Sequence, residues 1–440
     1  MHDFQQVADI LDGKLDETEY PYAKIAGWIQ QKFDVGGVLF LWIRDGTGVL
    51  QVTVHREDVS SEVFQMAEQL TQESSVIVEG NITQDKRAPG GYELQMQRLT
   101  VFQVADEWPI HTSDRPDVLM DRRHLWIRSP RQFSILRVRA EVIRAAREYL
   151  DGEGFVCVDT PILTPSICED TTTLFETEYF GRKAYLSQSG QLYNEADIFI
   201  FRKVYCYGPT FRAEKSRTRR HLTEFWMLEP EMAYMDHEDC IKVEEGLITT
   251  IVKRVLERCS REFNVLKRDL TPLEKVEPPY PRISYTEAVG KLQKASVKDP
   301  KLQITWGDDL GAPHERYISH LFELPVIVHR YPVRAKAFYM EPDPENPEVV
   351  LCNDLLAPEG YGEIIGASER ISNYELLERR LKEFGLPKEA HQWYLDLRRF
   401  GTVPHSGFGM GIERVVQWIC DLNHIREAIP YPRTIGRLYP

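Results

Sequence analysis

The chain has 440 residues, of which 42% are hydrophobic and 28% are charged, and its formal net charge is −14 at pH 7. This composition excludes disordered and collagen-like chains, and the length predicts two or three domains. The negative charge excludes a uniformly basic surface for nucleic acid, while a local basic groove stays compatible with it.

Residues 1–105 are predicted to form a small β-barrel. Asp45–Gly48 and Ala88–Gly91 have the composition of turns between strands, and residues 61–71 are predicted as a short helix. Five strands with a helix between the third and the fourth is the order of an OB-fold, a common oligonucleotide-binding module; a small barrel without a ligand is the alternative. The five strand-like segments are 23–30, 38–45, 49–54, 75–82 and 92–104.

A linker and a helix are predicted next. Residues 106–130 contain three prolines and charges of both signs, which is typical of a hinge. From residue 131 the apolar residues recur at the spacing of a helix, which Gly152 and Gly154 end.

Residues 131–440 are predicted to form an antiparallel α+β domain, because strands occur in runs with helices at intervals. Helices are expected from an N-cap at Asp236 to about Cys259, over Tyr374–Glu383, and after the glycines of 407–411. The polar, weakly patterned residues 260–320 are interpreted as an insertion. The strand-like segments are 184–192, 203–214, 221–235, 325–332, 336–343, 349–357 and 361–371.

The seven cysteines are scattered and include no CxxC pair. This pattern favours a reduced cytoplasmic protein over a disulfide framework or a structural zinc site. The N-terminus lacks the pattern of a signal peptide, and no apolar run reaches the ~18 residues of a spanning helix, so we expect no membrane segment.

One basic segment contrasts with the acidic chain. Between Arg202 and His221 there are seven Lys and Arg residues and one acid, Glu214. Two strand-like stretches joined by this loop would hold Arg212 on a strand and the other cations on the loop. This arrangement suits a triphosphate, because a guanidinium binds two oxygens at once. A solvated hairpin tip is the alternative.

Two further segments carry candidate ligand-binding chemistry. GFGMGIER at 407–414 is predicted as a glycine-rich turn into an apolar helix; its glycines allow close backbone approach, and Arg414 stands at the start of the helix. Asp354 and Glu363 lie on neighbouring strand-like segments and offer hard oxygen ligands for Mg²⁺; paired surface acids are the alternative. The absence of GxxxxGK[ST] and of a Rossmann pattern argues against nucleotide binding by those two folds.

Together these segments resemble the class II aminoacyl-tRNA synthetases. GFVCVDTPIL at 154–163, FRAE and RHLTEF within 211–225, and GFGMGIER at 407–414 stand in the order of that family's three motifs. The barrel is similar to the anticodon-binding domain of the aspartate/asparagine/lysine subclass, so the resemblance covers essentially the whole chain. It implies an antiparallel catalytic domain plus an OB-fold, ATP and Mg²⁺ as cofactors, a tRNA partner, and a homodimer formed through the first motif.

Within the subclass, the chain is most similar to the asparaginyl enzymes, through segments such as SQSGQL, KAFYM and IPYPRT. Asn194 stands where the aspartyl enzymes carry a lysine that pairs with the substrate carboxylate. Glu195 and Glu229 stand where they carry glutamine and aspartate. A pocket with one cation fewer favours an amide over a carboxylate, which implies L-asparagine and tRNA(Asn) as substrates. The alternatives are an aspartyl-tRNA synthetase, including one that charges both tRNAs, and a non-translational asparagine synthetase-like paralogue.

The resemblance also assigns roles to single residues, with Arg212, Glu214 and Arg414 as the catalytic ones. ATP would be bound by Arg212 at the α-phosphate, Glu214 at the adenine amino group, Phe225 stacked on adenine, His221 and Arg414 at the γ-phosphate, and Glu363 through Mg²⁺. The amino acid would be bound by Glu169, Ser189, Gln191, Glu195, Glu229 and Arg370, and Mg²⁺ by Asp354 and Glu363. On the barrel, Phe40 and Gln51 would bind the central anticodon base.

Overall fold

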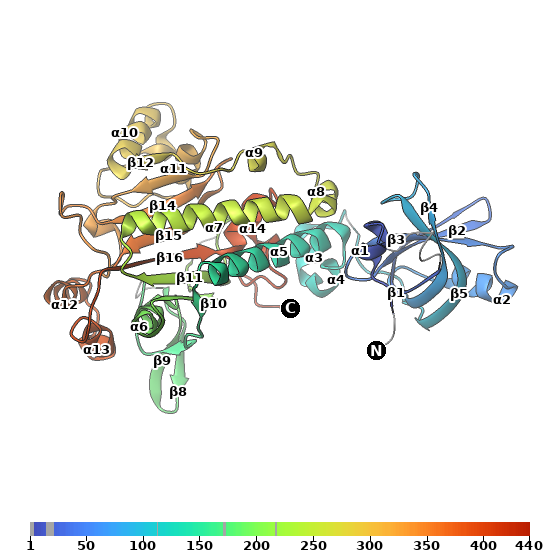
Figure 1. Ribbon diagram of the computed structural model, residues 1–440, viewed down its shortest axis with the longest axis horizontal. Helices are drawn as coiled ribbons and strands as arrows, with labels where there is room; N and C mark the ends of the chain where they lie inside the picture. Colours follow the sequence, from blue (N-terminus) through green and yellow to red (C-terminus); the bar gives the residue numbers. More distant parts are fainter. Residues whose placement is uncertain (1–3, 15–21, 112, 170–172, 216–217) are drawn as a thin grey trace. The chain divides into compact units, whose positions relative to one another are not determined.

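The computed structural model describes residues 4–14, 22–111, 113–169, 173–215 and 218–440 (Figure 1). The chain divides into two compact units, residues 1–114 and 115–440. The boundary falls inside the segment predicted as a hinge. The second half of that segment is helical, as α3 (Pro116–Asp121) and α4 (Arg123–Trp126). Arg217, one of the cations counted in the basic segment, lies outside the described residues.

The first unit is a closed five-stranded barrel with the strand order β1-β2-β3-β5-β4, which confirms the predicted OB-fold. Alternate residues of each strand, such as Leu39, Leu41 and Ile43, point into a fully buried core. Asp45 closes the β2–β3 turn, because its carboxylate accepts hydrogen bonds from the backbone of Thr47 and Gly48. The elements are α1 (Val7–Leu11), β1 (Tyr22–Val35), β2 (Val38–Arg44), β3 (Val49–His55), α2 (Ser61–Gln69), β4 (Ser75–Gln84) and β5 (Tyr92–Gln103).

The second unit is built on an eight-stranded sheet with the order β12-β13-β14-β15-β16-β11-β10-β6. All inner pairs are antiparallel, as predicted, while the two edge strands pair in parallel with β13 and β10. The strands are β6 (Val156–Cys157), β10 (Lys203–Phe211), β11 (Glu224–Ala233), β12 (Arg282–Ser284), β13 (Val326–His329), β14 (Cys352–Ala357), β15 (Gly362–Glu369) and β16 (His405–Gly411).

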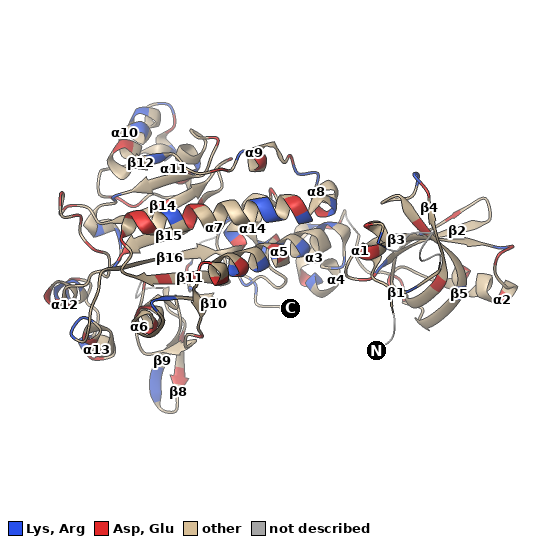
Figure 2. Ribbon diagram, in the orientation of Figure 1, with Lys and Arg blue, Asp and Glu red and all other residues tan. Residues whose placement is uncertain are grey.

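Three helices cover one face of this sheet: α5 (Pro130–Gly152), α7 (His237–Arg258) and α14 (Ile412–Ile419) (Figure 1). Helix α7 begins where predicted, since the Asp236 side chain accepts from the backbone of Asp239. Figure 2 shows residues of both charge signs along α7, whose first turn is acidic and whose last turn contains Arg258, as the helix dipole favours. The helices leave the opposite sheet face to the candidate site.

The alternation along β16 and β11 explains how the sheet separates core from site. In GFGMG the apolar residues Phe408 and Met410 join the helical core. The glycines that alternate with them approach side chains of β11: a Cβ on Gly407 would lie 2.2 Å from the carboxylate carbon of Glu231, and one on Gly409 would lie 2.4 Å from the methyl of Met227. Glycine is therefore required here by close approach, and the glycine-rich stretch is a strand rather than the predicted turn.

Smaller elements surround the open face of the sheet. The segment 260–320 packs its own apolar cluster and adds β12 to the sheet edge. Among the described residues, no helix has both the length and the apolar content to cross a membrane. The remaining elements are β7 (Leu163–Thr164), β8 (Glu176–Tyr179), β9 (Arg182–Leu186), α6 (Gln191–Phe201), α8 (Ser260–Leu266), α9 (Thr271–Glu274), α10 (Tyr285–Ser296), η2 (Pro300–Leu302), α11 (Ala312–Ser319), η3 (Val333–Ala335), α12 (Tyr374–Glu383), α13 (Lys388–Asp396) and η4 (Ile425–Glu427).

Two predicted strands are wrong in part. The strand predicted over 184–192 ends at Leu186, and helix α6 begins at Gln191, because the buried residues Gln191, Glu195 and Ile198 recur at helical spacing. The segment 336–343 forms only isolated bridges; its Pro342 has no N–H to give to a ladder.

Candidate active site

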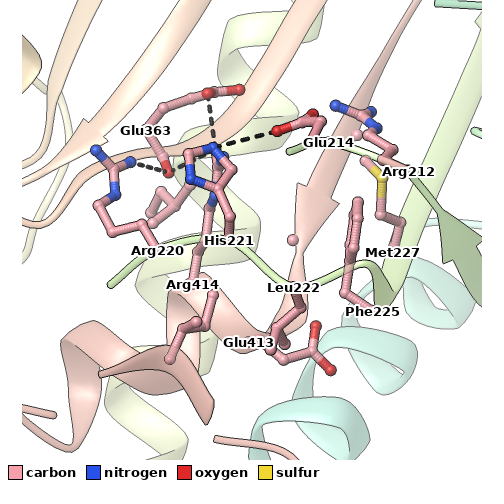
Figure 3. Close-up of a pocket in the computed structure, with 14 residues that line it drawn as sticks. Arg212, Glu214, Arg220, His221, Leu222, Phe225, Met227, Glu363, Glu413 and Arg414 are labelled. Atoms are coloured by element: carbon pink, nitrogen blue, oxygen red, sulfur yellow. Dashed lines mark hydrogen bonds and ion pairs between the residues drawn. The ribbon is translucent and has the colours of Figure 1, made fainter. Parts of the chain in front are cut away.

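A cavity opens on the face of the sheet that the three helices leave free, between β10, β11, β15 and β16 (Figure 3). Figure 3 shows Arg212 and Phe225 on one side and Arg220, His221 and Arg414 on the other. The cavity is lined by Arg212, Glu214, Arg220, His221, Leu222, Phe225, Met227, Glu363, Ile364, Gly409, Gly411, Glu413, Arg414 and Ile425. All six residues predicted to bind ATP are thus brought together.

Arg212 has no ion-pair partner among the described residues, unlike the two other arginines that line this cavity. It directly follows β10, and its guanidinium carbon lies 5.5 Å from the centre of the Phe225 ring. Its Nε is buried and has no hydrogen-bond partner within the described part of the chain. A buried donor without an acceptor is costly, so this position favours an anionic ligand.

The two other arginines are held by acids of neighbouring elements. Arg414 Nη1 donates to Glu363 Oε2 at 2.7 Å, and Arg220 Nη1 donates to Glu315 Oε2 at 2.9 Å. Arg220 also donates to the backbone oxygen of Glu363 at 3.2 Å. These contacts fix the planes of both guanidinium groups beside the cavity and leave further N–H groups for a ligand.

His221 lies between these charges. Its Nε2 is 3.5 Å from Glu214 Oε2, and its Nδ1 is hydrogen-bonded to the hydroxyl of Thr218. Burial, followed by the charges of Arg414 and Arg220, lowers the pKa of His221 below its ordinary value. This shift favours the neutral ring at pH 7.

A second cavity continues from the first, and the two share Arg212, Met227, Glu363 and Gly409. It extends to the N-terminus of α6 and to residues 335–340. Five of the six residues predicted to bind the amino acid line it: Glu169, Ser189, Gln191, Glu229 and Arg370.

Glu229 is the best-connected acid of this second cavity. It accepts from the Ser189 hydroxyl and, at 2.8 Å, from the backbone N–H of Gly190, and the Cys206 thiol lies 3.6 Å away. Burial raises the pKa of Glu229, although these donors oppose the shift. The donors fix Glu229 and Ser189 as one unit at the start of α6.

Arg370 is buried with its own counter-charge. Its Nε and Nη2 both donate to the carboxylate of Glu231, and its Nη1 donates to Ser368 Oγ at 2.6 Å. Although burial opposes it, the charge of Glu231 raises the pKa of Arg370. The guanidinium therefore offers its remaining N–H groups to a ligand while its net charge is already neutralised.

The carboxylates of Asp354 and Glu363 approach each other beside Gly366, in the wall of the second cavity. A Cβ on Gly366 would lie 3.3 Å from Glu363 Oε1 and 3.8 Å from Asp354 Oδ1, so both oxygens face one small space. Asp354 is also paired with Lys336 Nζ at 2.8 Å. Burial raises the pKa of Asp354 to about 7; Lys336 opposes this shift, while Glu363 and Asp309 add to it.

The donor chemistry of this space fits Mg²⁺, which prefers carboxylate oxygens and phosphate oxygens. Among the described residues no three His, Cys, Asp or Glu side chains form a complete metal site. Two protein carboxylates would leave the remaining ligand positions of a bound ion to phosphate oxygens and water.

Glu195 does not line the cavity, which corrects the prediction that it contacts the amino acid. Its side chain is fully buried behind α6, where Arg398 Nη2 donates to Oε2 at 2.6 Å and His405 Nε2 lies 3.0 Å from the same oxygen. These two side chains, distant in sequence, hold the carboxylate away from the cavity.

On the barrel, Phe40 and Gln51 lie on one outward face, since Gln51 pairs across the ladder with Trp42. The Phe33 and Trp42 rings adjoin Phe40 on this face, with their centroids 5.8 Å apart. Gln51 Nε2 donates to Glu93 Oε2 at 3.0 Å. Glu93 and the two extra aromatic rings are parts of this face that the sequence analysis missed.

Four residues in or beside the cavities of the second unit were also not predicted as site residues: Glu231, Asp309, Lys336 and Tyr339. Lys336 and Tyr339 lie in KAFYM, a segment already noted for its resemblance, but it was interpreted as a strand. Lys336 and Asp309 belong to the wall around Asp354, and Tyr339 donates to Glu169 at 3.2 Å.

Comparison with known proteins agrees with this geometry. Residues 115–435 match the tRNA synthetases of class II (D, K and N), and residues 23–102 match the OB-fold nucleic acid binding domain. The chain is 55% identical over 425 residues to an asparagine–tRNA ligase of Chloroflexus aurantiacus, covering 94% of this chain and 95% of that one. It is 54% identical over 417 residues to that of Desulforamulus reducens, covering 94% and 96%.

A solved structure extends the comparison to the fold. The crystal structure of asparaginyl-tRNA synthetase from Pyrococcus horikoshii complexed with asparaginyl-adenylate superposes with a TM-score of 0.93. The two sequences are 48% identical, and the match covers 100% of both chains.

Proposed function

Since this chain belongs to the tRNA synthetases of class II (D, K and N), we infer that it activates L-asparagine with ATP and transfers it to tRNA(Asn). The observation that carries this conclusion is one continuous cavity with an unpaired guanidinium, Arg212, where its two parts join and a neutralised guanidinium, Arg370, in the second part. The surroundings of Arg212 suit a phosphate, and those of Arg370 suit an uncharged polar side chain.

The charges in the second part of the cavity favour asparagine over aspartate. Arg370 is paired with Glu231, and the acids Glu169 and Glu229 line the same cavity. A substrate carboxylate would enter a partly dry site without a free cation, which is unfavourable. An amide can accept from Arg370 and donate to a carboxylate, so it satisfies both.

In the first step, an oxygen of the asparagine carboxylate attacks the α-phosphorus of ATP. A bond forms between them as the bond to the leaving pyrophosphate breaks, which yields asparaginyl-adenylate. We assign to Arg212 the stabilisation of the charge on the α-phosphate, and to Phe225 and Glu214 the stacking and hydrogen bonding of adenine. His221 and Arg414 would hold the γ-phosphate. The protein acts by positioning and by charge stabilisation.

Mg²⁺ would be held by Glu363 and Asp354 together with phosphate oxygens. The ion would offset the charge of the triphosphate. Lys336 keeps Asp354 in place before ATP binds, since it donates to both carboxylate oxygens.

In the second step, a hydroxyl at the 3′ end of the tRNA attacks the adenylate carbonyl and AMP leaves. The barrel would bind the anticodon, with Phe40 stacking on a base and Gln51 hydrogen-bonding to it. A Phe40→Ala variant should raise the KM for tRNA in acylation about 10-fold or more, since one stacked base is worth ~1–3 kcal/mol, and leave pyrophosphate exchange unchanged.

We also propose a homodimer formed through the segment 154–163 and the hairpin of β8 and β9. Ile162 and Leu163 are each 45% exposed and Phe180 is 89% exposed, beside a groove lined by residues 160–165 and 182–184. Contiguous exposed apolar residues are typical of an interface. Sedimentation should give a mass of twice 51.2 kDa, and a Leu163→Asp variant should sediment at half that value.

The cysteines support a reducing cytoplasm as the location. All seven are free thiols; Cys157 is exposed and the other six are buried. An oxidising compartment would favour disulfides in their place.

The deciding experiment is ATP–pyrophosphate exchange with asparagine and aspartate in parallel, followed by acylation of tRNA. We expect exchange with asparagine and little with aspartate. Exchange with aspartate alone would assign an aspartyl enzyme, and exchange without tRNA acylation would assign the non-translational paralogue.

A further inference from the structure

The Glu195 carboxylate is the centre of a sealed hydrogen-bond network behind the amino-acid end of the cavity. Its Oε1 accepts from Gln191 Nε2 at 3.0 Å and from the Tyr394 hydroxyl at 2.9 Å. Its Oε2 accepts from Arg398 Nη2 at 2.6 Å and is 3.0 Å from His405 Nε2. The network joins α6 to α13 and β16, elements about 200 residues apart in the chain.

The network fixes the carboxylate in its ionised form. Glu195, Arg398 and His405 have no exposed side-chain surface. The Arg398 guanidinium, which can only donate, faces Glu195 Oε2, and His405 Nδ1 is 2.7 Å from the Val403 carbonyl oxygen. Burial alone would raise the pKa of Glu195, but the charges of Arg398 and His405 hold it well below its ordinary value.

Gln191 is the only one of these partners of Glu195 that also lines the cavity. An ionised carboxylate cannot donate, so the NH₂ group of Gln191 must be the end that faces Glu195. The amide oxygen is then directed to the other side, and no described residue donates to it. The Gln191 backbone N–H, which donates to Ser189 Oγ at 3.1 Å, anchors the residue at the first turn of α6.

We propose that Glu195 is a positioning residue for amino-acid recognition: it holds the Gln191 amide in the one orientation that presents an acceptor oxygen to a donor group of the bound amino acid. The proposal rests on the proposed function, which supplies an amino acid bearing an ammonium and an amide NH₂. It also gives a role to a buried glutamate that does not line the cavity itself. A neutral residue in place of Glu195 would allow the Gln191 amide to flip. Its NH₂ group, and not its oxygen, would then face the bound amino acid.

The test is Glu195→Gln in ATP–pyrophosphate exchange, with KM measured for each substrate. Loss of one ligand hydrogen bond that involves a charged group should raise the KM for asparagine about 10- to 100-fold. The KM for ATP should change less than about 3-fold, because the ATP end shares no residue with the network. An unchanged KM for asparagine would overturn the proposal.

Tyr394→Phe is the matched control. It removes another hydrogen bond to the same buried carboxylate and leaves the Gln191 contact in place. It should reduce thermal stability without raising the KM for asparagine. A rise equal to that of Glu195→Gln would show that Glu195 acts only through general stability.

A double-mutant cycle separates action through Gln191 from any other route. In a Gln191→Ala background, Glu195→Gln should add almost nothing to the KM for asparagine, whereas additive effects would contradict the proposal. If Glu195→Gln does not fold, Glu195→Asp keeps the charge and withdraws the carboxylate oxygen from Gln191. We then expect the same result, a raised KM for asparagine with a nearly unchanged KM for ATP. A wild-type protein without asparagine-dependent exchange would refute the proposed function; a normal wild type with an unaffected variant refutes only this inference.

Discussion

The two ends of the cavity are built on opposite principles. At the ATP end, Arg212, His221 and Arg414 are all partly exposed, and Arg212 has no acidic partner among the described residues. At the amino-acid end, Glu229 is 5% exposed and Arg370 is 3% exposed, and each already has several hydrogen-bond partners.

This difference matches the two ligands. A triphosphate brings several negative charges, and a site that leaves cations unsatisfied gains most when it binds. Asparagine has an uncharged side chain that differs from that of aspartate by one NH₂ group in place of oxygen. A site without spare charge and with fixed donors and acceptors discriminates between these two by the groups left unpaired.

The largest effect is expected from removing the unpaired cation. Arg212→Ala should lower adenylate formation by about 10²- to 10³-fold or more, because the group stabilises charge that develops in the transition state. The far-UV circular dichroism should stay unchanged. Arg399→Ala, at an exposed arginine outside both cavities, is the matched control and should have normal exchange. Normal pyrophosphate exchange in Arg212→Ala would contradict the idea that the ATP end acts through an unpaired cation.

The second-largest effect is expected from creating an unpaired positive charge at the amino-acid end. Glu231→Gln leaves Arg370 without its counter-charge, so a substrate carboxylate can supply it. The preference for asparagine over aspartate, measured as the ratio of kcat/KM, should fall about 10- to 100-fold. Stability should also fall, since breaking a buried pair costs about 3–5 kcal/mol. Glu238→Gln, at an exposed acid on α7, should change neither quantity; an unaltered ratio in Glu231→Gln would mean that Arg370 does not set the preference.

A third variant acts where the two ends meet. Gly366→Ala places a methyl group 3.3 Å from Glu363 Oε1, in the space that both carboxylates face. The Mg²⁺ concentration for half-maximal exchange should rise about 10-fold, the effect of losing roughly 1.4 kcal/mol of binding. Gly208→Ala on β10, where a Cβ would meet no atom within 4 Å, is the control. Equal Mg²⁺ dependence in both variants would place the ion elsewhere.

The smallest effect is a pH dependence confined to the ATP end. The pKa of His221 is lowered by burial and by Arg414, so the free ring is neutral at pH 7 and a bound phosphate favours its protonation. ATP binding thus takes up a proton, and the KM for ATP should rise a few-fold between pH 6 and pH 8. ATP itself titrates in this range, so His221→Asn provides the reference. Identical profiles for the two proteins would remove His221 from the γ-phosphate.

The sequence predicted the parts of the molecule that local rules determine. The N-cap at Asp236, the helix over Tyr374–Glu383 and the five barrel strands follow from side-chain hydrogen bonds and hydrophobic spacing within a few residues. Five of the six residues predicted to bind ATP lie in two short motifs, at 211–225 and 407–414, whose roles came from the resemblance to a known family, and the cavity brings them together with Glu363.

The side-chain contacts at the amino-acid end could not be predicted in the same way. Glu195 lies close to Gln191 in sequence, but Arg398 and His405, which hold it behind the cavity, are 203 and 210 residues away. The pairing of Arg370 with Glu231 likewise spans 139 residues. Such partners are brought together only by the register of the sheet, so neither composition nor local sequence pattern predicts these contacts. Helix α13 was missed as well, although it supplies Tyr394 to the network.

The distribution of the thiols has a practical consequence. Cys157, on β6, is the one exposed cysteine of the seven, and it lies within the segment proposed to form the dimer. A fluorescent maleimide should therefore label separated chains at a single position, without replacement of the other six cysteines. Protection of this thiol from the reagent at high protein concentration would then report the association of the subunits.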